Sequence, residues 1–278
     1  MQHEWKMEII NGTYEKGKFR FALFDFDGTI SLIREGWQGV MKSYFYGEMR
    51  ATPLGGGESE ESIRACIDEF VDVNTGKQTI YQCFALVEEL EKRGGKPLDA
   101  QEYKDEYQRR LLEQVQHRIT GLEQKTIEPK ACVVPGSFEL LGMLQRHGVE
   151  MFLASGTDEQ YAQHEADILG VTPYFKGRVY GAQRDYKSFS KKMVVQRIIK
   201  ENDLNGNELI GFGDGFVEIE NVKESGGFAV GVASDERNHD GRVDEWKRER
   251  LIRAGADIII PDFSGIRQLK AYLFGEEQ

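Results

Sequence analysis

The sequence predicts an α/β protein with a doubly wound parallel sheet and a helical domain inserted after the first strand. From residue 133 onward, short apolar runs alternate with amphipathic segments, which is typical of such a sheet and its covering helices. Between the first strand and residue 133, the apolar residues recur only at the spacing of amphipathic helices. We therefore expect a core domain at residues 1–32 and 131–278, and a helical domain at residues 33–130.

The composition narrows the classes of function. The chain has 278 residues and a formal net charge of −11, which argues against a broad nucleic-acid-binding surface. No apolar run approaches the ~20 residues that are needed to span a bilayer. The three cysteines match no zinc or redox spacing, so we expect free thiols in a reducing cytoplasm. We expect a monomer or homodimer whose partner is a small molecule, with no nucleic-acid or membrane partner.

The first expected strand ends in two acidic residues. Residues 21–24 (Phe-Ala-Leu-Phe) form an apolar run, which predicts a strand buried on both faces of a parallel sheet. Asp25 and Asp27 follow it, and Gly28-Thr29 predicts a turn. Ligands bind at this end of the strands in open α/β sheets. Because two adjacent buried carboxylates repel each other, a fold keeps them only with a compensating charge, usually a metal.

The segment between residues 33 and 130 shows helical spacing throughout. Ile63, Ile67 and Phe70 illustrate the pattern, because they recur every three or four residues. The expected helices lie at residues 40–45, 58–73, 77–93 and 99–120.

The remaining elements alternate as a parallel sheet requires. Expected strands lie at residues 149–154, 177–182, 208–214, 228–232 and 256–260. Expected helices follow Ser137, a suitable N-cap, and lie at residues 158–169, 190–202, 216–225 and 265–274. The charged segment at residues 234–253 is expected to be solvated.

Two further strand ends carry polar residues that can converge with Asp25 and Asp27. Ser155 follows one strand, and Gly156 leaves backbone N–H groups open to an anion at the next helix. Asp214 follows another strand, and Glu218 lies about one helical turn further on. Taken singly, Ser155 is better explained as a helix N-cap, and Asp214 can be an ordinary turn residue. Their common position at strand ends favours a shared site.

Together these motifs resemble those of the haloacid dehalogenase (HAD) superfamily of hydrolases, which has a Rossmann-like core. Asp25-x-Asp27-Gly-Thr matches the first motif, and Ser155 matches the second. Asp214 and Glu218 match the fourth, although Asp is commoner than Glu at the second position. The insertion lies where this family carries its C1 cap, a helical lid over the active site. The resemblance is to the C1-capped phosphatases similar to phosphoglycolate phosphatase and β-phosphoglucomutase.

The third motif of the family is a lysine near a helix start, and three lysines compete for it. They are Lys187, Lys191 and Lys192. The spacing to the helix expected at residues 193–202 favours Lys191, with Lys192 next. Candidate lid contacts early in the insertion are Trp37, Lys42, Tyr44 and Arg50.

The resemblance implies a Mg²⁺-dependent phosphatase that hydrolyses a small phosphate ester, such as a sugar phosphate or phosphoglycolate, through an aspartyl-phosphate. Asp25 would be the nucleophile and Asp27 the general acid and base. The implied catalytic residues are Asp25, Asp27, Ser155 and Lys191; the phosphate-binding residues are Thr29, Ser155, Gly156, Lys191 and Lys192; and the Mg²⁺ ligands are Asp25, Asp27 through its carbonyl, Asp214 and Glu218.

Other functions remain open at this point. Asp27 marks phosphatases and phosphomutases within the family, so a sugar-phosphate mutase is the main alternative. A catalytically silent binding module on the same fold is a second, although the retained acids argue against it. A dinucleotide-binding protein fits poorly, because residues 211–215 lack the G-x-G-x-x-G spacing.

Overall fold

The computed structural model describes residues 5–238 and 241–275, and the chain forms two compact units. The core unit comprises Met1–Glu35 and Arg118–Gln278, and the cap unit comprises Gly36–His117. Helix α4 (Ala100–Glu123) runs through the second boundary. The domain boundaries at residues 33 and 130 remain predictions from the sequence.

The core unit contains a sheet of seven strands in its described part, in the order β1-β7-β6-β5-β2-β3-β4. All neighbours pair in parallel except β1, which is antiparallel to β7. The strands are β1 (Glu8–Ile9), β2 (Phe21–Phe24), β3 (Glu150–Asp158), β4 (Val179–Ala182), β5 (Leu209–Gly213), β6 (Phe228–Val232) and β7 (Ile258–Ile260). The predicted α/β fold is confirmed. The edge strand β1 was not expected, because it has only two residues and lies in a polar segment without an apolar run.

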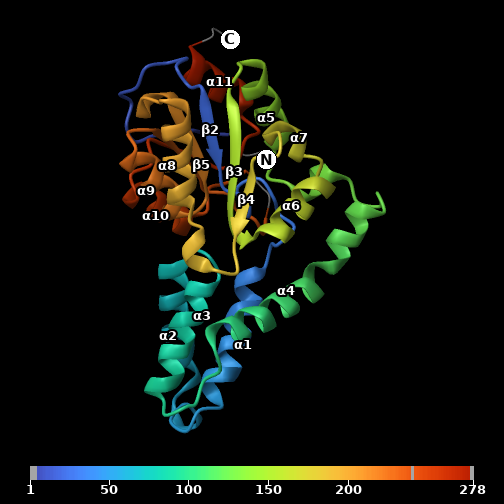
Figure 1. Cartoon of the computed structure of the whole chain (residues 1–278), viewed down its shortest axis with the longest axis vertical. Helices are drawn as coiled ribbons and strands as arrows, with labels where there is room; N and C mark the ends of the chain where they lie inside the picture. Colours follow the sequence, from blue (N-terminus) through green and yellow to red (C-terminus); the bar gives the residue numbers. More distant parts are fainter. Residues whose placement is uncertain (1–4, 239–240, 276–278) are drawn as a thin grey trace. The chain divides into compact units, whose positions relative to one another are not determined.

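Helices cover both faces of this sheet, as a doubly wound fold requires. In Figure 1, α8, α9 and α10 lie on one side of the sheet and α5, α6 and α7 on the other. Helix α11 packs on α5. The helices are α5 (Ser137–Arg146), α6 (Glu159–Ile168), α7 (Thr172–Phe175), α8 (Lys191–Asn202), α9 (Phe216–Glu224), α10 (Glu245–Arg253) and α11 (Ile266–Phe274), and short 3₁₀ turns lie at Pro129–Cys132, Tyr186–Ser188 and Gly206–Glu208.

Strand β2 lies at the centre of the sheet, between β3 and β5. All four of its side chains are buried, and Phe24 stacks on Phe212 of β5 with ring centroids 4.6 Å apart. Phe24 is also in register with Leu153 of β3. Because the three strands are parallel and in register, the residues that follow them emerge at the same edge of the sheet.

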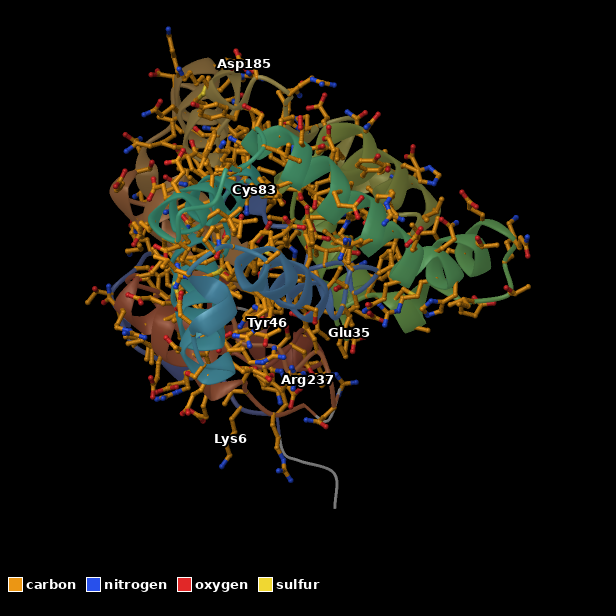
Figure 2. All side chains as sticks on the ribbon, turned by 90° about the horizontal axis from the view of Figure 1, so that it is seen from below. Lys6, Glu35, Tyr46, Cys83, Asp185 and Arg237 are labelled. Atoms are coloured by element: carbon orange, nitrogen blue, oxygen red, sulfur yellow. The ribbon has the colours of Figure 1, made fainter. Side chains whose placement is uncertain are left out.

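The cap unit is helical, as the sequence predicted. Its elements are α1 (Trp37–Arg50), α2 (Glu60–Asn74), α3 (Ile80–Lys92), most of α4, and a 3₁₀ turn at Gly55–Gly57. Phe45, Ile67 and Leu86 from three different helices are fully or almost fully buried, so the unit has an apolar core of its own. Cys66 and Cys83 in this unit (Cys83 is labelled in Figure 2) and Cys132 in the core are free. None of the described helices is long and apolar enough to cross a membrane.

Two local expectations are wrong. The segment at residues 234–253 is not simply solvated, because it contains α10, whose Lys247 and Leu251 are buried. Ser137 does not cap α5 but is its first residue, and its hydroxyl donates to the Val134 carbonyl at 2.6 Å.

Candidate active site

The edge of the sheet beyond β2, β3 and β5 gathers the acidic residues predicted from the sequence. The backbone of Asp25 stays in the sheet, since its N–H donates to the Phe212 carbonyl of β5 at 2.9 Å. The turn that follows is tight, because the N–H groups of both Ile30 and Ser31 donate to the Phe26 carbonyl. This turn directs Asp25 and Asp27 into different surroundings.

Asp25 lies in a buried ion-paired group with Lys191 and Glu218. The Lys191 ammonium donates to Asp25 Oδ1 at 2.8 Å and also pairs with Glu218 Oε1. The side chains of Lys191 and Asp25 are 5% and 8% exposed, and Glu218 is almost fully buried. Lys191 begins α8, where the Ser190 hydroxyl accepts from the Met193 N–H and fixes the helix start. The structure thus brings Lys191 to Asp25.

Asp25 is held in a strongly acidic neighbourhood. Burial raises the pKa of Asp25 to about 7; Lys191 opposes this shift, and the charges of Asp214 and Asp27 add to it. Among the described residues, none donates a hydrogen bond to Glu218 Oε2, which is also buried. The group therefore holds more negative charge than its own ammonium balances.

Asp27 is more accessible and is held by hydroxyl groups. Its Oδ2 accepts from Ser155 Oγ at 3.2 Å and from Thr157 Oγ1 at 2.9 Å, both on β3. Its Oδ1 lies 3.9 Å from the Arg34 guanidinium and has no hydrogen-bond donor within the described part of the chain. The side chain is 23% exposed, against 8% for Asp25. The two aspartates therefore differ in access and in partners. Thr157 was not predicted, although its position two residues after Ser155 on a strand places both on one face.

Asp214 is fixed by the turn that follows β2. Its N–H donates to Thr29 Oγ1 at 2.9 Å, and the same hydroxyl lies 3.4 Å from Asp214 Oδ1. Thr29 is fully buried. Gly28 has φ +76°, and a Cβ there would lie only 2.3 Å from Asp214 Oδ2, so this turn needs glycine. Thr29 therefore holds Asp214 in place, and its expected role in phosphate binding stays a prediction.

Comparison with known proteins identifies the family. A family model of haloacid dehalogenase-like hydrolases matches residues 19–226. The chain belongs to the haloacid dehalogenase-like hydrolases. This match spans every residue of the site described so far in this subsection, from Asp25 to Glu218. A search of curated proteins found no match.

Solved structures share the fold of this HAD hydrolase at low sequence identity. A predicted phosphoglycolate phosphatase from Haemophilus somnus is 15% identical, with a TM-score of 0.57 over 91% of this chain and 98% of that one. A family IA HAD hydrolase from Entamoeba histolytica is 18% identical, with a TM-score of 0.59 over 92% and 99%. A HAD family hydrolase from Deinococcus radiodurans, solved with bound phosphate and sodium, is 14% identical, with a TM-score of 0.52 over 92% and 96%. The cap unit lies in the chain where C1-capped members carry their cap.

Three other residues predicted from the sequence have no hydrogen bond or ion pair with Asp25 among the described residues. Lys192 is exposed and pairs with Glu224 at 2.7 Å, and Lys187 lies in the 3₁₀ turn Tyr186–Ser188. Gly156 is half-buried between Ser155 and Thr157.

Three of the four proposed lid residues have partners inside the cap unit. Lys42 pairs with Asp68, Arg50 donates to the Gly55 carbonyl, and the Tyr44 ring is covered by a guanidinium. Trp37 is half-buried at the start of α1. Their role toward a substrate stays a prediction.

A buried Arg34–Glu165 pair borders Asp27 and was missed by sequence reasoning. The Arg34 guanidinium donates to both Glu165 oxygens, at 2.7 to 3.1 Å, and both residues are almost fully buried. Burial raises the pKa of Glu165, although Arg34 opposes the shift. A possible signal was the spacing of Glu165 with Ala162, since both lie on the buried face of α6. The pair anchors the chain segment between the core and α1.

A second buried lysine, Lys247 of α10, was also missed. Its Nζ lies 2.8 Å from Asp214 Oδ2 and pairs with Glu236. Burial lowers the pKa of Lys247, but Asp214 and Glu236 outweigh this effect and hold the pKa above its usual value. The Lys247 ammonium therefore stays positively charged and in contact with Asp214.

Proposed function

We propose that this HAD hydrolase is a phosphatase that hydrolyses a small phosphorylated metabolite, such as a sugar phosphate or a phosphoglycolate-like acid, through an aspartyl-phosphate on Asp25. The observation that carries the proposal is the unequal pair of aspartates. Asp25 is buried and contacts an ammonium, whereas Asp27 is more exposed and accepts two hydroxyl hydrogen bonds. Phosphate transfer to a carboxylate and on to water needs these two distinct roles.

The reaction divides between these two residues. Asp25 attacks the phosphorus atom, and the bond between phosphorus and the ester oxygen breaks. Asp27, protonated at the start, gives its proton to the departing alcohol. Asp27 then takes a proton from water, which attacks the phosphorus of the aspartyl-phosphate and releases inorganic phosphate and free Asp25.

Three groups suit the transferred phosphoryl oxygens. The Ser155 hydroxyl and the Gly156 N–H lie at the end of β3, and the Lys191 ammonium already contacts Asp25. Lys191 offsets the charge that gathers on Asp25 and on the oxygens during transfer. Glu218 holds Lys191 in place through the buried ion pair.

The donor set fits Mg²⁺, which we assign as the cofactor. No three His, Cys, Asp or Glu side chains converge as a ready metal cluster in the described residues. Mg²⁺ does not need one, because it usually keeps several waters and takes one or two carboxylates. Asp25 and Asp214 would supply these, with the Asp27 carbonyl and, through water, Glu218. When bound, the cation offsets repulsion between Asp25 and the phosphate dianion. The raised pKa of Asp25 supports this assignment, since nearby carboxylates favour a compensating cation.

The test is phosphate release from a panel of small phosphate esters, with Mg²⁺ and with EDTA. We expect turnover that requires Mg²⁺ and that falls by about 10⁴-fold or more in Asp25→Asn, because the nucleophile is lost. Asp105→Asn, on the exposed surface of α4, is the matched control and should behave like the wild type.

Other outcomes identify the alternatives. Activation by a sugar bisphosphate without net phosphate release would show a mutase. Mg²⁺ binding by a folded protein that releases phosphate from no ester and is not activated in this way would show a silent binding module.

A further inference from the structure

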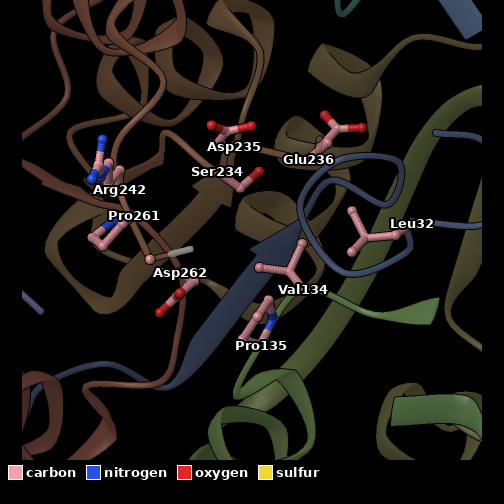
Figure 3. A pocket seen from close by; sticks show the side chains of 10 residues that line it. Leu32, Val134, Pro135, Ser234, Asp235, Glu236, Arg242, Pro261 and Asp262 are labelled. Carbon is pink, nitrogen blue, oxygen red and sulfur yellow. The ribbon is translucent and has the colours of Figure 1, made fainter. Parts of the chain in front are cut away.

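A charged cluster behind Asp214 has no role in the reaction described above. It consists of Lys247 on α10 with Ser234 and Glu236 in the loop that follows β6. The Lys247 ammonium contacts Asp214 Oδ2 at 2.8 Å and Ser234 Oγ at 3.3 Å, and it also pairs with Glu236 Oε1. Figure 3 shows Ser234 and Glu236 lining a small pocket next to Leu32. Glu236 and Lys247 lie beyond residue 226, where the family match ends.

The fold holds this ammonium in one place. Asp244 caps α10 by accepting from the Lys247 N–H at 2.9 Å, and Leu251 anchors the same helix face in the core. Ser234 Oγ in turn donates to the Gly28 carbonyl at 2.9 Å. The side chain of Lys247 is only 11% exposed. Its charge therefore acts on Asp214 at close range and with little screening by solvent.

The positive charge of Lys247 reduces the net negative charge that a cation would meet at Asp214. Asp214 and Glu236 share one ammonium, so part of the negative charge of Asp214 is already balanced. Any cation that binds Asp214 must share its carboxylate with Lys247. Glu236 weakens the competition between Lys247 and a cation for Asp214, because the Lys247 ammonium also pairs with the Glu236 carboxylate.

We propose that Lys247 is a positioning residue and built-in counter-ion for Asp214, which holds this carboxylate in place without a metal and weakens its affinity for Mg²⁺. The inference rests on the proposed function, because it takes Asp214 as a Mg²⁺ ligand. Glu236 has the opposite effect and strengthens Mg²⁺ binding by occupying part of the charge of Lys247.

The experiment is a calorimetric titration of Mg²⁺ into the EDTA-treated and dialysed full chain, without substrate. The variants are Lys247→Met, Lys247→Arg, Glu236→Gln and Asp214→Asn, with Lys200→Met on the exposed face of α8 as the control for loss of one surface charge. Lys247→Met should lower the Kd for Mg²⁺ by about tenfold, because one nearby positive charge is lost. Glu236→Gln should raise the Kd. Lys247→Arg should leave the Kd within about twofold of the wild type because it keeps the positive charge, and Lys200→Met should do the same because that charge is remote and exposed.

Thermal melting of the same proteins adds a readout independent of calorimetry. In EDTA, Lys247→Met should melt below the wild type, because two close carboxylates have lost their counter-ion. Mg²⁺ should then raise its melting temperature by more than that of the wild type.

The outcomes separate the inference from the proposed function. An unchanged or higher Kd in Lys247→Met overturns the inference alone, provided that the wild type binds Mg²⁺ and Asp214→Asn does not. If Lys247→Met does not fold, an unchanged or lower Kd in Glu236→Gln overturns it. Wild-type protein that binds no Mg²⁺, or binds it equally well in Asp214→Asn, overturns both the inference and the metal assignment.

Discussion

Two lysines of the core unit have matching local arrangements. Lys191 is shared by Asp25 and Glu218, and Lys247 is shared by Asp214 and Glu236. Each lysine lies in the first turn of a helix whose N-cap side chain accepts a backbone hydrogen bond, Ser190 for α8 and Asp244 for α10. Each ammonium is almost completely buried. The same design, a capped helix that carries one ammonium to two carboxylates, thus occurs twice at one edge of the sheet.

The difference between them lies in what the first carboxylate does. Asp25 is the proposed nucleophile, so the charge of Lys191 acts where bonds form and break. Asp214 is a proposed metal ligand, so the charge of Lys247 acts on the affinity for the cofactor. Identical ion pairing can therefore serve the chemical step in one cluster and the charge balance of the site in the other.

The largest expected effect separates the two lysines by turnover. Lys191→Met should reduce kcat by about 10³-fold, because the transferring phosphoryl group loses its nearest positive charge. Lys247→Met should change kcat less than about tenfold at saturating Mg²⁺, since it contacts no group of the reacting pair. The measurement is the rate of phosphate release at saturating substrate and Mg²⁺.

Folding of both variants must be checked by thermal melting, and Lys200→Met supplies the baseline for a lost surface lysine. If Lys247→Met loses as much kcat as Lys191→Met, the two clusters serve the same step and the division drawn here is wrong.

The sequence allowed one cluster to be predicted and not the other. Asp25 follows a run of apolar residues, which periodicity locates. Lys191 was expected from the third motif of the family, and the spacing to the helix that follows favoured it over Lys187 and Lys192. The pairing of Lys191 with Glu218 was not predicted.

Helix α10 has the sequence Glu-Trp-Lys-Arg-Glu-Arg-Leu-Ile-Arg, and of these residues only Lys247 and Leu251 are buried. One of the two buried positions of α10 is a lysine, so the sequence shows no repeated apolar residues that would predict a buried helix face. The segment was therefore expected to be solvated.

The same limit explains the other missed contacts. Arg34 and Glu165 are almost fully buried because they satisfy each other across 131 residues of sequence. A charged residue is normally expected at the surface unless its partner is known. The parallel strands and the helices could be predicted because apolar periodicity defines them locally. Pairings between distant charges could not.

A second prediction uses Gly28, whose added side chain would contact Asp214 and Glu236, the two carboxylates that share Lys247. At Gly28, with φ +76°, an added Cβ would lie 2.3 Å from Asp214 and 2.9 Å from Glu236 Oε1. Gly177 has nearly the same φ, +78°, but an added Cβ would meet nothing within 4 Å. Gly177→Ala should therefore cost about 1 kcal/mol of unfolding free energy, from backbone strain alone. Gly28→Ala should cost about 2 kcal/mol more, because the clash adds to the strain.

Urea unfolding in EDTA gives both free energies, and a Mg²⁺ titration of Gly28→Ala should show weaker binding as Asp214 is displaced. Equal destabilisation of the two variants would mean that the neighbours of Gly28 move aside at no cost, and that the Lys247 cluster is not rigid.

The smallest expected effect tests whether the N-cap residue of each helix, Ser190 for α8 and Asp244 for α10, positions the lysine of that helix. Ser190→Ala and Asp244→Ala should each destabilise the protein by about 1 kcal/mol, because each removes one N-cap acceptor. Their functional effects should differ: Ser190→Ala should lower kcat with Mg²⁺ affinity unchanged, and Asp244→Ala should change Mg²⁺ affinity with kcat nearly unchanged. Ser190→Thr and Asp244→Asn keep a capping oxygen and are the matched controls. A kcat loss in Asp244→Ala at saturating Mg²⁺ would show that α10 positions the reacting groups as well as the metal ligand.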